Sequence, residues 1–343
     1  MSDLKISVKN LYKIFGNNTA AAQNMLNEGF SKDEVFAKTG HVVGVNRVSF
    51  DVNQGEIYVL MGLSGSGKST LIQDVLAPAL LRHFGKATET PGAHTRLLGA
   101  EQLSEVVFVD QSPIGKTARS NPASYVGAWD AIRELFANSD LARQRSYTAS
   151  KFSFNSGDGR CPLCGGSGFE HVEMQFLSDV YLRCPDCDGT RFRAEVREVK
   201  IERLGKQLSI SDVLELTVAE AVRLFGQDVD VVRALQPLHD VGLDYVKLGQ
   251  PVPTLSGGEA QRLKLAGHLV ETAQQASKSG QRMARKGTLF MFDEPTTGLH
   301  FDDIAKLMRA LRKLLDAGNA IILIEHNLDV IRSCDWLIEL GPE

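Results

Sequence analysis

The sequence contains no long hydrophobic run, since none approaches the ~18 consecutive apolar residues that cross a membrane. Its first residues also lack the apolar stretch of a secretory signal peptide, so we expect a cytoplasmic protein. Charge of one sign is not in excess either: 38 Lys and Arg stand against 42 Asp and Glu, a net charge of −4. With 343 residues and 43 % hydrophobic residues, the chain is expected to be globular rather than disordered.

Cysteine is scarce, which excludes a disulfide scaffold. Four of the five cysteines nevertheless cluster in two C-P-x-C pairs, Cys161 with Cys164 and Cys184 with Cys187. The spacing between the pairs is that of structural zinc sites. Four thiolates would close a tetrahedral Zn²⁺ site and leave no open position for catalysis. A redox C-x-x-C motif is the alternative, although it would not need two copies.

Glycine is plentiful, and one glycine-rich segment predicts a nucleotide-binding loop. Gly62–Ser69 fits G-x-x-x-x-G-K-[ST] and stands between a predicted strand, 57–61, and a predicted helix, 68–81. Backbone N–H groups of such a loop turn toward phosphate oxygens, helped by the helix N-terminus. We therefore expect Lys68 to reach the β- and γ-phosphates of ATP and Ser69 to ligate Mg²⁺. The other predicted loop residues are Gly62, Ser64, Gly65, Gly67 and Thr70.

A second segment predicts the hydrolytic carboxylates. The apolar run 289–292 leads directly into Asp293 and Glu294. A strand of this kind would place Asp293 beside the Mg²⁺ and let Glu294 polarise the attacking water. Such a pair is common at a plain strand end, but together with the phosphate loop it indicates an ATPase.

The segment Leu255–Glu259 matches the signature of ATP-binding cassette (ABC) ATPases. In these proteins the N-terminus of a helix from one module caps the γ-phosphate held by the loop of another. Gln111 resembles the Q-loop glutamine and His326 the switch histidine, so both join Glu294 as predicted catalytic residues. Each signature acts on a neighbour's loop, which predicts a head-to-tail homodimer. The predicted signature contacts to ATP are Ser256, Gly257 and Gly258.

These motifs predict an α/β protein with an ABC-type P-loop ATPase fold, a helical signature subdomain and an inserted four-cysteine zinc module. Half-buried strands are expected over 3–11 and 43–52, the apolar residues of the second being in phase. Residues 112–210 show no sustained core periodicity and are interpreted as the insertion. The predicted segments are 1–110 (β-layer and phosphate loop), 111–210 (insertion), 211–287 (helical signature subdomain) and 288–343 (end of the ATPase domain). The abrupt end predicts a partial protein.

A basic stretch precedes and enters the zinc module. Between residues 142 and 160 four basic side chains stand against one acidic one, a local charge of +3 (4 − 1). Phe152 and Phe154 lie among them. Basic residues beside aromatic ones can contact phosphates and stack on bases. A solvated charged loop is the alternative interpretation.

From Leu71 to Glu343 the chain resembles the C-terminal half of the UvrA family, damage-sensing ATPases of bacterial nucleotide excision repair. The matching stretches are 110–115, 119–122, 152–155, 248–251, 255–262, 293–300 and 324–329. The resemblance implies ATP-dependent binding of damaged double-stranded DNA, with Arg145, Lys151 and Arg160 facing the duplex. Nuclease activity is not predicted, because no residue set for it is visible in the sequence. A UvrB-like partner is not expected to bind, because the half that binds it is absent.

Residues 4–70 resemble a different family, the ATPase subunits of glycine betaine/proline ABC importers. The matching stretches are 11–16, 29–34, 38–40 and 61–70. The resemblance implies that an aromatic residue stacks on adenine, Phe15 being the best match and Tyr12 the second. The two resemblances meet within Ser64–Thr70, which predicts a chimeric chain. The alternative function is therefore an importer ATPase on a membrane permease, although the long cysteine-bearing segment favours DNA.

Overall fold

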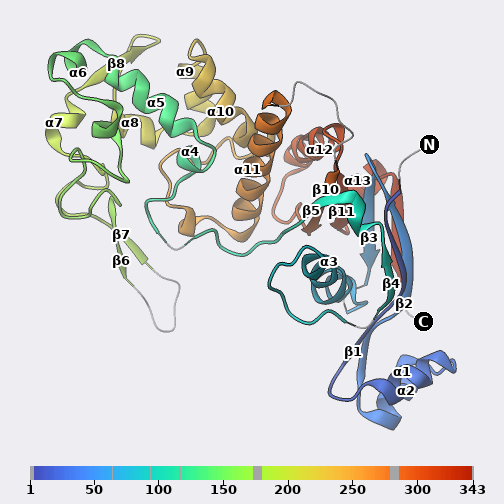
Figure 1. The fold of residues 1–343 in the computed structure, drawn as a ribbon. Coiled ribbons are helices and arrows are strands. Elements are labelled where there is room, and N and C mark those ends of the chain that lie inside the picture. Colours follow the sequence, from blue (N-terminus) through green and yellow to red (C-terminus); the bar gives the residue numbers. More distant parts are fainter. Residues whose placement is uncertain are drawn as a thin grey trace. The chain divides into compact units, whose positions relative to one another are not determined.

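The computed structural model describes residues 4–63, 65–92, 94–115, 117–172, 180–278 and 286–341. Ser64, one of the predicted phosphate-loop residues, lies outside the described residues. The chain forms two compact units (Figure 1), the first made of residues 1–110 and 274–343, the second of residues 111–273. The finer division of the chain into four segments stays a prediction.

The first unit contains a three-stranded antiparallel sheet in the order β2-β1-β4. Its strands are β1 (Leu4–Phe15), β2 (Val42–Asn53) and β4 (His94–Leu98), of which only the first two are indicated by sequence alternation. Two short helices, α1 (Ala20–Asn27) and α2 (Lys32–Thr39), connect β1 to β2 (Figure 1). These helices pack against Tyr12 and Val43.

The buried face of β2 changes phase halfway along the strand. Val43 and Val45 are buried, whereas the later buried residues are Phe50 and Val52, at even-numbered positions. Between the two sets Arg47 has a φ of +52°, and β2 has one residue more than β1 across this step of the register. A β-bulge therefore absorbs the extra residue and returns the apolar side chains to the core. The expectation that the whole strand is in phase is wrong.

The first unit also contains a five-stranded parallel sheet in the order β12-β3-β11-β10-β5. The strands are β3 (Ile57–Gly62), β5 (Leu103–Val109), β10 (Gly287–Asp293), β11 (Ala320–Ile324) and β12 (Trp336–Leu340). The helical segments are η1 (Thr70–Leu76) and α3 (Ala77–His83) after β3, η2 (Ala100–Gln102) before β5, α12 (Phe301–Asp316) before β11 and α13 (Leu328–Ser333) before β12. Because the strands are parallel, their carboxyl ends meet at one edge.

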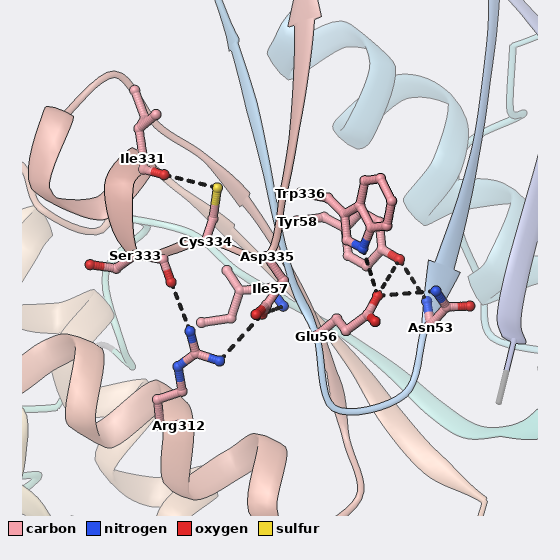
Figure 2. Close-up of polar contacts among 10 residues, drawn as sticks. All are labelled: Asn53, Glu56, Ile57, Tyr58, Arg312, Ile331, Ser333, Cys334, Asp335 and Trp336. Atoms are coloured by element: carbon pink, nitrogen blue, oxygen red, sulfur yellow. Dashed lines mark hydrogen bonds and ion pairs between the residues drawn. The ribbon is translucent and has the colours of Figure 1, made fainter. Parts of the chain in front are cut away.

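At the amino ends of these strands, polar contacts connect the outer strand β12 to β3 (Figure 2). A carboxylate oxygen of Glu56 accepts hydrogen bonds from the Tyr58 hydroxyl at 2.8 Å and the Trp336 indole N–H at 2.9 Å. The Asp335 carboxylate accepts from the backbone N–H of Ile57 at 2.8 Å. Burial, and then the bond to Glu56, raise the pKa of Tyr58, so this hydroxyl stays a donor.

The second unit is largely helical and carries the cysteines. Its elements are α4 (Pro122–Tyr125), α5 (Ala128–Ala137), α6 (Asp140–Gln144), η3 (Ala149–Phe152), β6 (Phe169–Val172), β7 (Val180–Arg183), α7 (Ala194–Arg197), β8 (Lys200–Arg203), β9 (Lys206–Ser209), α8 (Ile210–Glu215), α9 (Val218–Leu224), α10 (Val229–Asp240), η4 (Val252–Thr254) and the long α11 (Gly257–Lys278), whose last residues, from 274 on, are counted with the first unit. Among the described helices, none combines the length and apolarity needed to cross a membrane.

The prediction that residues 112–210 lack core periodicity is wrong for α5. This helix buries Trp129, Ile132 and Phe136 on one face, a spacing typical of an amphipathic helix. The helix covers only 10 residues, and it lies among glycine-, serine- and charge-rich stretches that hide so short a pattern.

Candidate nucleotide and metal sites

The candidate nucleotide site lies at the carboxyl edge of the parallel sheet. β3, β11 and β10 are neighbours, and across them Leu60 pairs with Ile324, which pairs with Asp293. The phosphate loop follows β3, His326 follows β11 and Glu294 follows β10. Residues more than two hundred positions apart in the sequence therefore meet at one edge, as the motifs predict.

The phosphate loop packs closely on β2. Gly67 has a φ of +91°, and a Cβ there would lie 2.2 Å from the backbone oxygen of Gly44. Lys68 donates from its ammonium group to the backbone oxygens of Gly62 at 2.7 Å and Leu63 at 3.1 Å. The ammonium group thus lies back along the loop, where phosphate oxygens could take the place of the carbonyl groups. The loop fits a bound polyphosphate.

Asp293 is a half-buried carboxylate at the end of β10. Burial, and next the charge of Glu294, raise the pKa of Asp293, while a hydrogen bond from Gln73 and the charge of Lys68 oppose the shift. The Gln73 amide donates to Asp293 Oδ2 at 2.7 Å. A divalent cation would offset the repulsion between the two acidic residues, so the pair fits the predicted Mg²⁺ site. No sequence motif indicated Gln73.

Glu294 and His326, both predicted to be catalytic, face each other. Glu294 Oε1 lies 3.7 Å from His326 Nδ1, with side chains that are 42 % and 70 % exposed. The backbone N–H of Glu294 donates to the Ile324 oxygen at 2.9 Å, and its φ is +45°. A non-glycine residue in this left-handed region is strained, and such strain concentrates at functional sites.

The two aromatic candidates for adenine stacking differ in accessibility. Phe15 is 43 % exposed, and a Cβ on Gly44 would lie 2.9 Å from the Phe15 ring and 3.1 Å from the Thr70 methyl group. Phe15 therefore lies beside the beginning of η1. Tyr12 is buried, and its hydroxyl donates to Asn27 at 3.1 Å. Accessibility favours Phe15 over Tyr12.

The signature sequence begins α11 in the second unit. The Ser256 hydroxyl and backbone N–H both donate to Glu259, at 3.0 and 2.8 Å, which forms a capping box. Gln111 lies against the first residue of this helix, because a Cβ on Gly257 would be 3.2 Å from its side chain. Both belong to the second unit, so the structure places Gln111 beside the signature sequence.

The four clustered cysteines converge as the spacing predicts. Their sulfur atoms all lie within 4.8 Å of one another, with 4.0 Å between Cys161 and Cys184 and 3.7 Å between Cys164 and Cys187. A tetrahedral ion with Zn–S bonds of about 2.3 Å requires sulfur atoms about 3.8 Å apart. The backbone N–H of Gly168 donates to Cys164 Sγ at 3.3 Å, a contact that favours the thiolate. The donor set fits Zn²⁺.

A buried arginine lies behind the cysteine cluster. Arg191 is 1 % exposed; its guanidinium group donates to the Gly249 oxygen at 2.8 Å and lies over the Phe154 ring. Its own backbone oxygen accepts from the N–H of Cys161 at 2.8 Å. Burial lowers the pKa of Arg191 to about 10, against the opposing effect of the Cys164 sulfur. Arg191 thus connects the cysteine module, which carries the four clustered cysteines, to the loop that contains Gly249 and precedes the signature sequence. The sequence did not indicate this role.

The three cations predicted to face DNA already have partners within the second unit. Arg145 contacts Glu198 at 2.5 Å, and Lys151 contacts Asp158 at 2.9 Å. Arg160 donates to three backbone carbonyl groups of neighbouring loops. Arg145 is exposed and Arg160 is half-buried, whereas the Lys151 side chain is largely buried.

Phe152 and Phe154 are not available for stacking on bases. Both are completely buried, with ring centroids 5.6 Å from Phe136 and 5.1 Å from Trp129 respectively. They form the aromatic core that joins η3 to α5. The interpretation of these residues as a stacking surface is wrong.

Metal analysis is expected to find about one zinc per chain, because four converging thiols complete a structural site. Cys184→Ser should lose the metal and unfold the cysteine module at lower temperature. Cys334→Ser is the matched control, since Cys334 lies outside the cluster and should keep both properties. Elemental analysis and thermal unfolding with and without a chelator provide the measurements. A parent protein that is fully folded without metal would contradict the site.

The parallel sheet, the phosphate loop, the strand-end residues and the signature helix define an ABC ATPase fold. Residues 45–88 match a family described as "ABC transporter". The chain is homologous to part of UvrABC system protein A, with 50 % identity to the Thermus thermophilus protein over 299 residues. This match covers 87 % of the chain and 30 % of the relative. The Mycobacterium bovis protein is 48 % identical over 309 residues, covering 90 % and 30 % respectively.

A solved structure agrees with this relationship. The crystal structure of UvrA2 from Deinococcus radiodurans superposes with a TM-score of 0.70 and 44 % identity, covering 86 % of this chain and 34 % of that one. The predicted resemblance to UvrA is confirmed. The chain spans about a third of the length of the relatives that it matches. The resemblance of residues 4–70 to importer ATPases stays a prediction.

Proposed function

We propose that the chain binds and hydrolyses MgATP, and that its nucleotide state governs binding to damaged double-stranded DNA. The observation that carries the proposal is the shared edge of β3, β11 and β10, which the phosphate loop, His326 and Glu294 follow. Homology to UvrABC system protein A supports the DNA-repair context.

The phosphate loop and its neighbours would hold the nucleotide. Backbone N–H groups of the loop and the Lys68 ammonium group would bind the β- and γ-phosphates. Ser69 and Asp293 would ligate Mg²⁺, which neutralises phosphate charge when bound. Phe15, exposed beside the beginning of η1, would stack on adenine. The further loop contacts are those expected from the motif, Gly62, Ser64, Gly65, Gly67 and Thr70.

Hydrolysis would use the facing pair at the strand ends. Glu294 would orient a water molecule and accept its proton, while the His326 ring would donate a hydrogen bond to a γ-phosphate oxygen. The 3.7 Å separation of the two side chains leaves each close to the same region of the edge. Their high exposure implies that another surface must exclude bulk water from the site.

A second copy of the chain would supply that surface. The N-terminus of α11, with Ser256, Gly257 and Gly258, presents backbone N–H groups and a positive helix end to an incoming phosphate. Glu259 accepts the Ser256 hydroxyl, so engagement of a γ-phosphate would release this capping contact. Gln111 lies against Gly257 and would respond to the same event. A head-to-tail homodimer with two composite sites follows.

The cysteine module would help to engage DNA. Because Arg145 and Lys151 are paired with acidic residues, they would have to exchange these partners for phosphates. Arg160 is bonded to carbonyl groups that carry no full charge, so it needs less rearrangement to reach a phosphate. We therefore rank Arg160 above the other two as a DNA contact.

ATP turnover and DNA binding, measured with undamaged and damaged duplex over a salt series, test the proposed function. Damaged duplex should stimulate turnover and bind more weakly as salt rises, because phosphate contacts release counterions. Lys68→Ala is the control that should abolish the nucleotide effect. Turnover indifferent to duplex, together with binding indifferent to salt, would contradict the DNA role. An importer ATPase remains the second candidate, but the cysteine-bearing unit of residues 111–273 favours DNA.

A further inference from the structure

A buried carboxylate that the mechanism above does not use lies next to the switch histidine. Glu325 is 0 % exposed and follows β11 directly. Its backbone N–H donates to the Leu60 oxygen of β3 at 3.1 Å, which fixes it to the strand that leads into the phosphate loop. A buried charge is costly unless hydrogen bonds satisfy it. Its partners therefore indicate its role.

Glu325 joins two loops of the candidate site. Oε1 accepts from the backbone N–H of Thr296 at 2.9 Å and from the Thr296 hydroxyl at 2.7 Å. Oε2 accepts from the backbone N–H groups of His326 at 3.0 Å and Asn327 at 3.2 Å. Hydrogen bonds to a charged acceptor are roughly twice as strong as neutral ones. One side chain thus fastens the turn after Glu294 to the loop that carries His326.

We propose that Glu325 is a positioning residue for ATP hydrolysis, holding Glu294 and His326 at their mutual distance. Glu294 stands two residues before Thr296, and its φ of +45° persists only if neighbouring contacts enforce it. By holding Thr296 with one oxygen and His326 with the other, Glu325 supplies those contacts. The inference rests on the proposed hydrolysis but concerns a residue outside the predicted catalytic set.

Glu325→Gln tests the role because it keeps the size of the side chain. A glutamine accepts at its oxygen only, so its NH₂ group would face either the Thr296 donors or the His326 and Asn327 donors. The value of kcat should fall about 10- to 100-fold, as small misplacements of catalytic groups do. The KM for ATP should stay within about threefold, because the Glu325 carboxylate bonds to Thr296, His326 and Asn327, whereas the phosphate loop and Lys68 would supply most of the ATP binding.

Two further variants define the effect. Thr296→Val removes the hydroxyl donor but keeps the backbone N–H, so kcat should fall by a smaller factor, about two- to tenfold. Glu339→Gln changes an exposed glutamate on β12, the outer strand of the same sheet, in the same way and should leave kcat unchanged. Circular dichroism confirms folding of each variant. An unchanged kcat in folded Glu325→Gln would overturn the proposal.

A double-variant cycle separates positioning from general weakening of the fold. If Glu325 acts through His326, the combination with His326→Ala should be no more than about twofold slower than His326→Ala alone. If the loss of kcat in the double variant equals the product of the losses in the two single variants, Glu325 and His326 act independently, which also overturns the proposal.

A spectroscopic experiment tests the same role without measuring ATP turnover. In the full chain with ¹³C-labelled histidine, the His326 ring signal is assigned by its disappearance in His326→Ala. Glu294→Gln should shift this signal in the parent and leave it unshifted in the Glu325→Gln background. Equal shifts in both backgrounds would overturn the positioning role. If the parent protein shows no ATP turnover, the proposed function is contradicted. The histidine spectra would still test whether Glu325 positions His326.

Discussion

Glu294→Gln is expected to reduce ATP turnover by about 10²- to 10⁴-fold, the usual contribution of a positioned general base. Glutamine has nearly the size of glutamate but cannot accept the proton of the attacking water. ATP binding should be kept or become tighter, because the Glu294 charge contributes to the raised pKa of Asp293 and its removal lowers the repulsion there. Steady-state turnover and equilibrium binding of a fluorescent ATP analogue measure the two effects.

The same variant should lengthen the life of the ATP-bound dimer. If hydrolysis releases two head-to-tail copies, then slowing it lets the dimer accumulate with ATP but not with ADP, which gel filtration detects. Glu339→Gln provides the matched control, since this glutamate is exposed on β12 and lies outside the predicted site. Turnover within a factor of about two of the parent would exclude Glu294 as the base.

The parallel sheet could be predicted because buried parallel strands are continuous apolar runs. The runs that become β3 and β10 end at motif residues, and His326 stands two residues after β11, so the sequence indicated both the strands and their shared edge. The phase change in β2 could not be seen in this way, because a bulge at Arg47 adds one residue to a two-residue repeat. β4 was missed for another reason: its five residues depend on pairing with β1 for their position.

In the candidate site, the residues that belong to a motif with a characteristic spacing could be predicted from the sequence. The residues whose role depends on contacts with distant parts of the chain could not. The four cysteines carry a recognisable interval, and their sulfur atoms converge as expected. Glu325 and Arg191 carry no such interval: each acquires its role from backbone groups brought near by folding. For Phe152 the sequence pattern predicted a role that the residue does not have. An aromatic residue beside basic ones has the same sequence pattern whether it is exposed or buried, and Phe152 is buried.

Gly67→Ala is expected to lower ATP affinity by more than about 100-fold, and turnover with it. An alanine at this position meets two penalties. Its φ of +91° lies in the region that side chains avoid, at a cost of about 1–2 kcal/mol. Its Cβ would also lie 2.2 Å from the Gly44 oxygen, which belongs to the backbone of β2 and not to a flexible side chain. The loop must shift instead, and its N–H groups would no longer converge on the phosphates.

Gly55→Ala separates the backbone strain from the steric clash, because an alanine at position 55 would have the strain but not the clash. Gly55 has a φ of +75°, and no atom lies within 4 Å of a Cβ built there. This variant should lose about 1–2 kcal/mol of folding stability through backbone strain alone and bind ATP like the parent. Equilibrium nucleotide binding and thermal unfolding, measured on both variants, therefore compare strain with collision. Equal losses of ATP affinity would mean that strain, rather than contact with Gly44, governs the phosphate loop, and the close packing of loop on β2 would then have no part in binding.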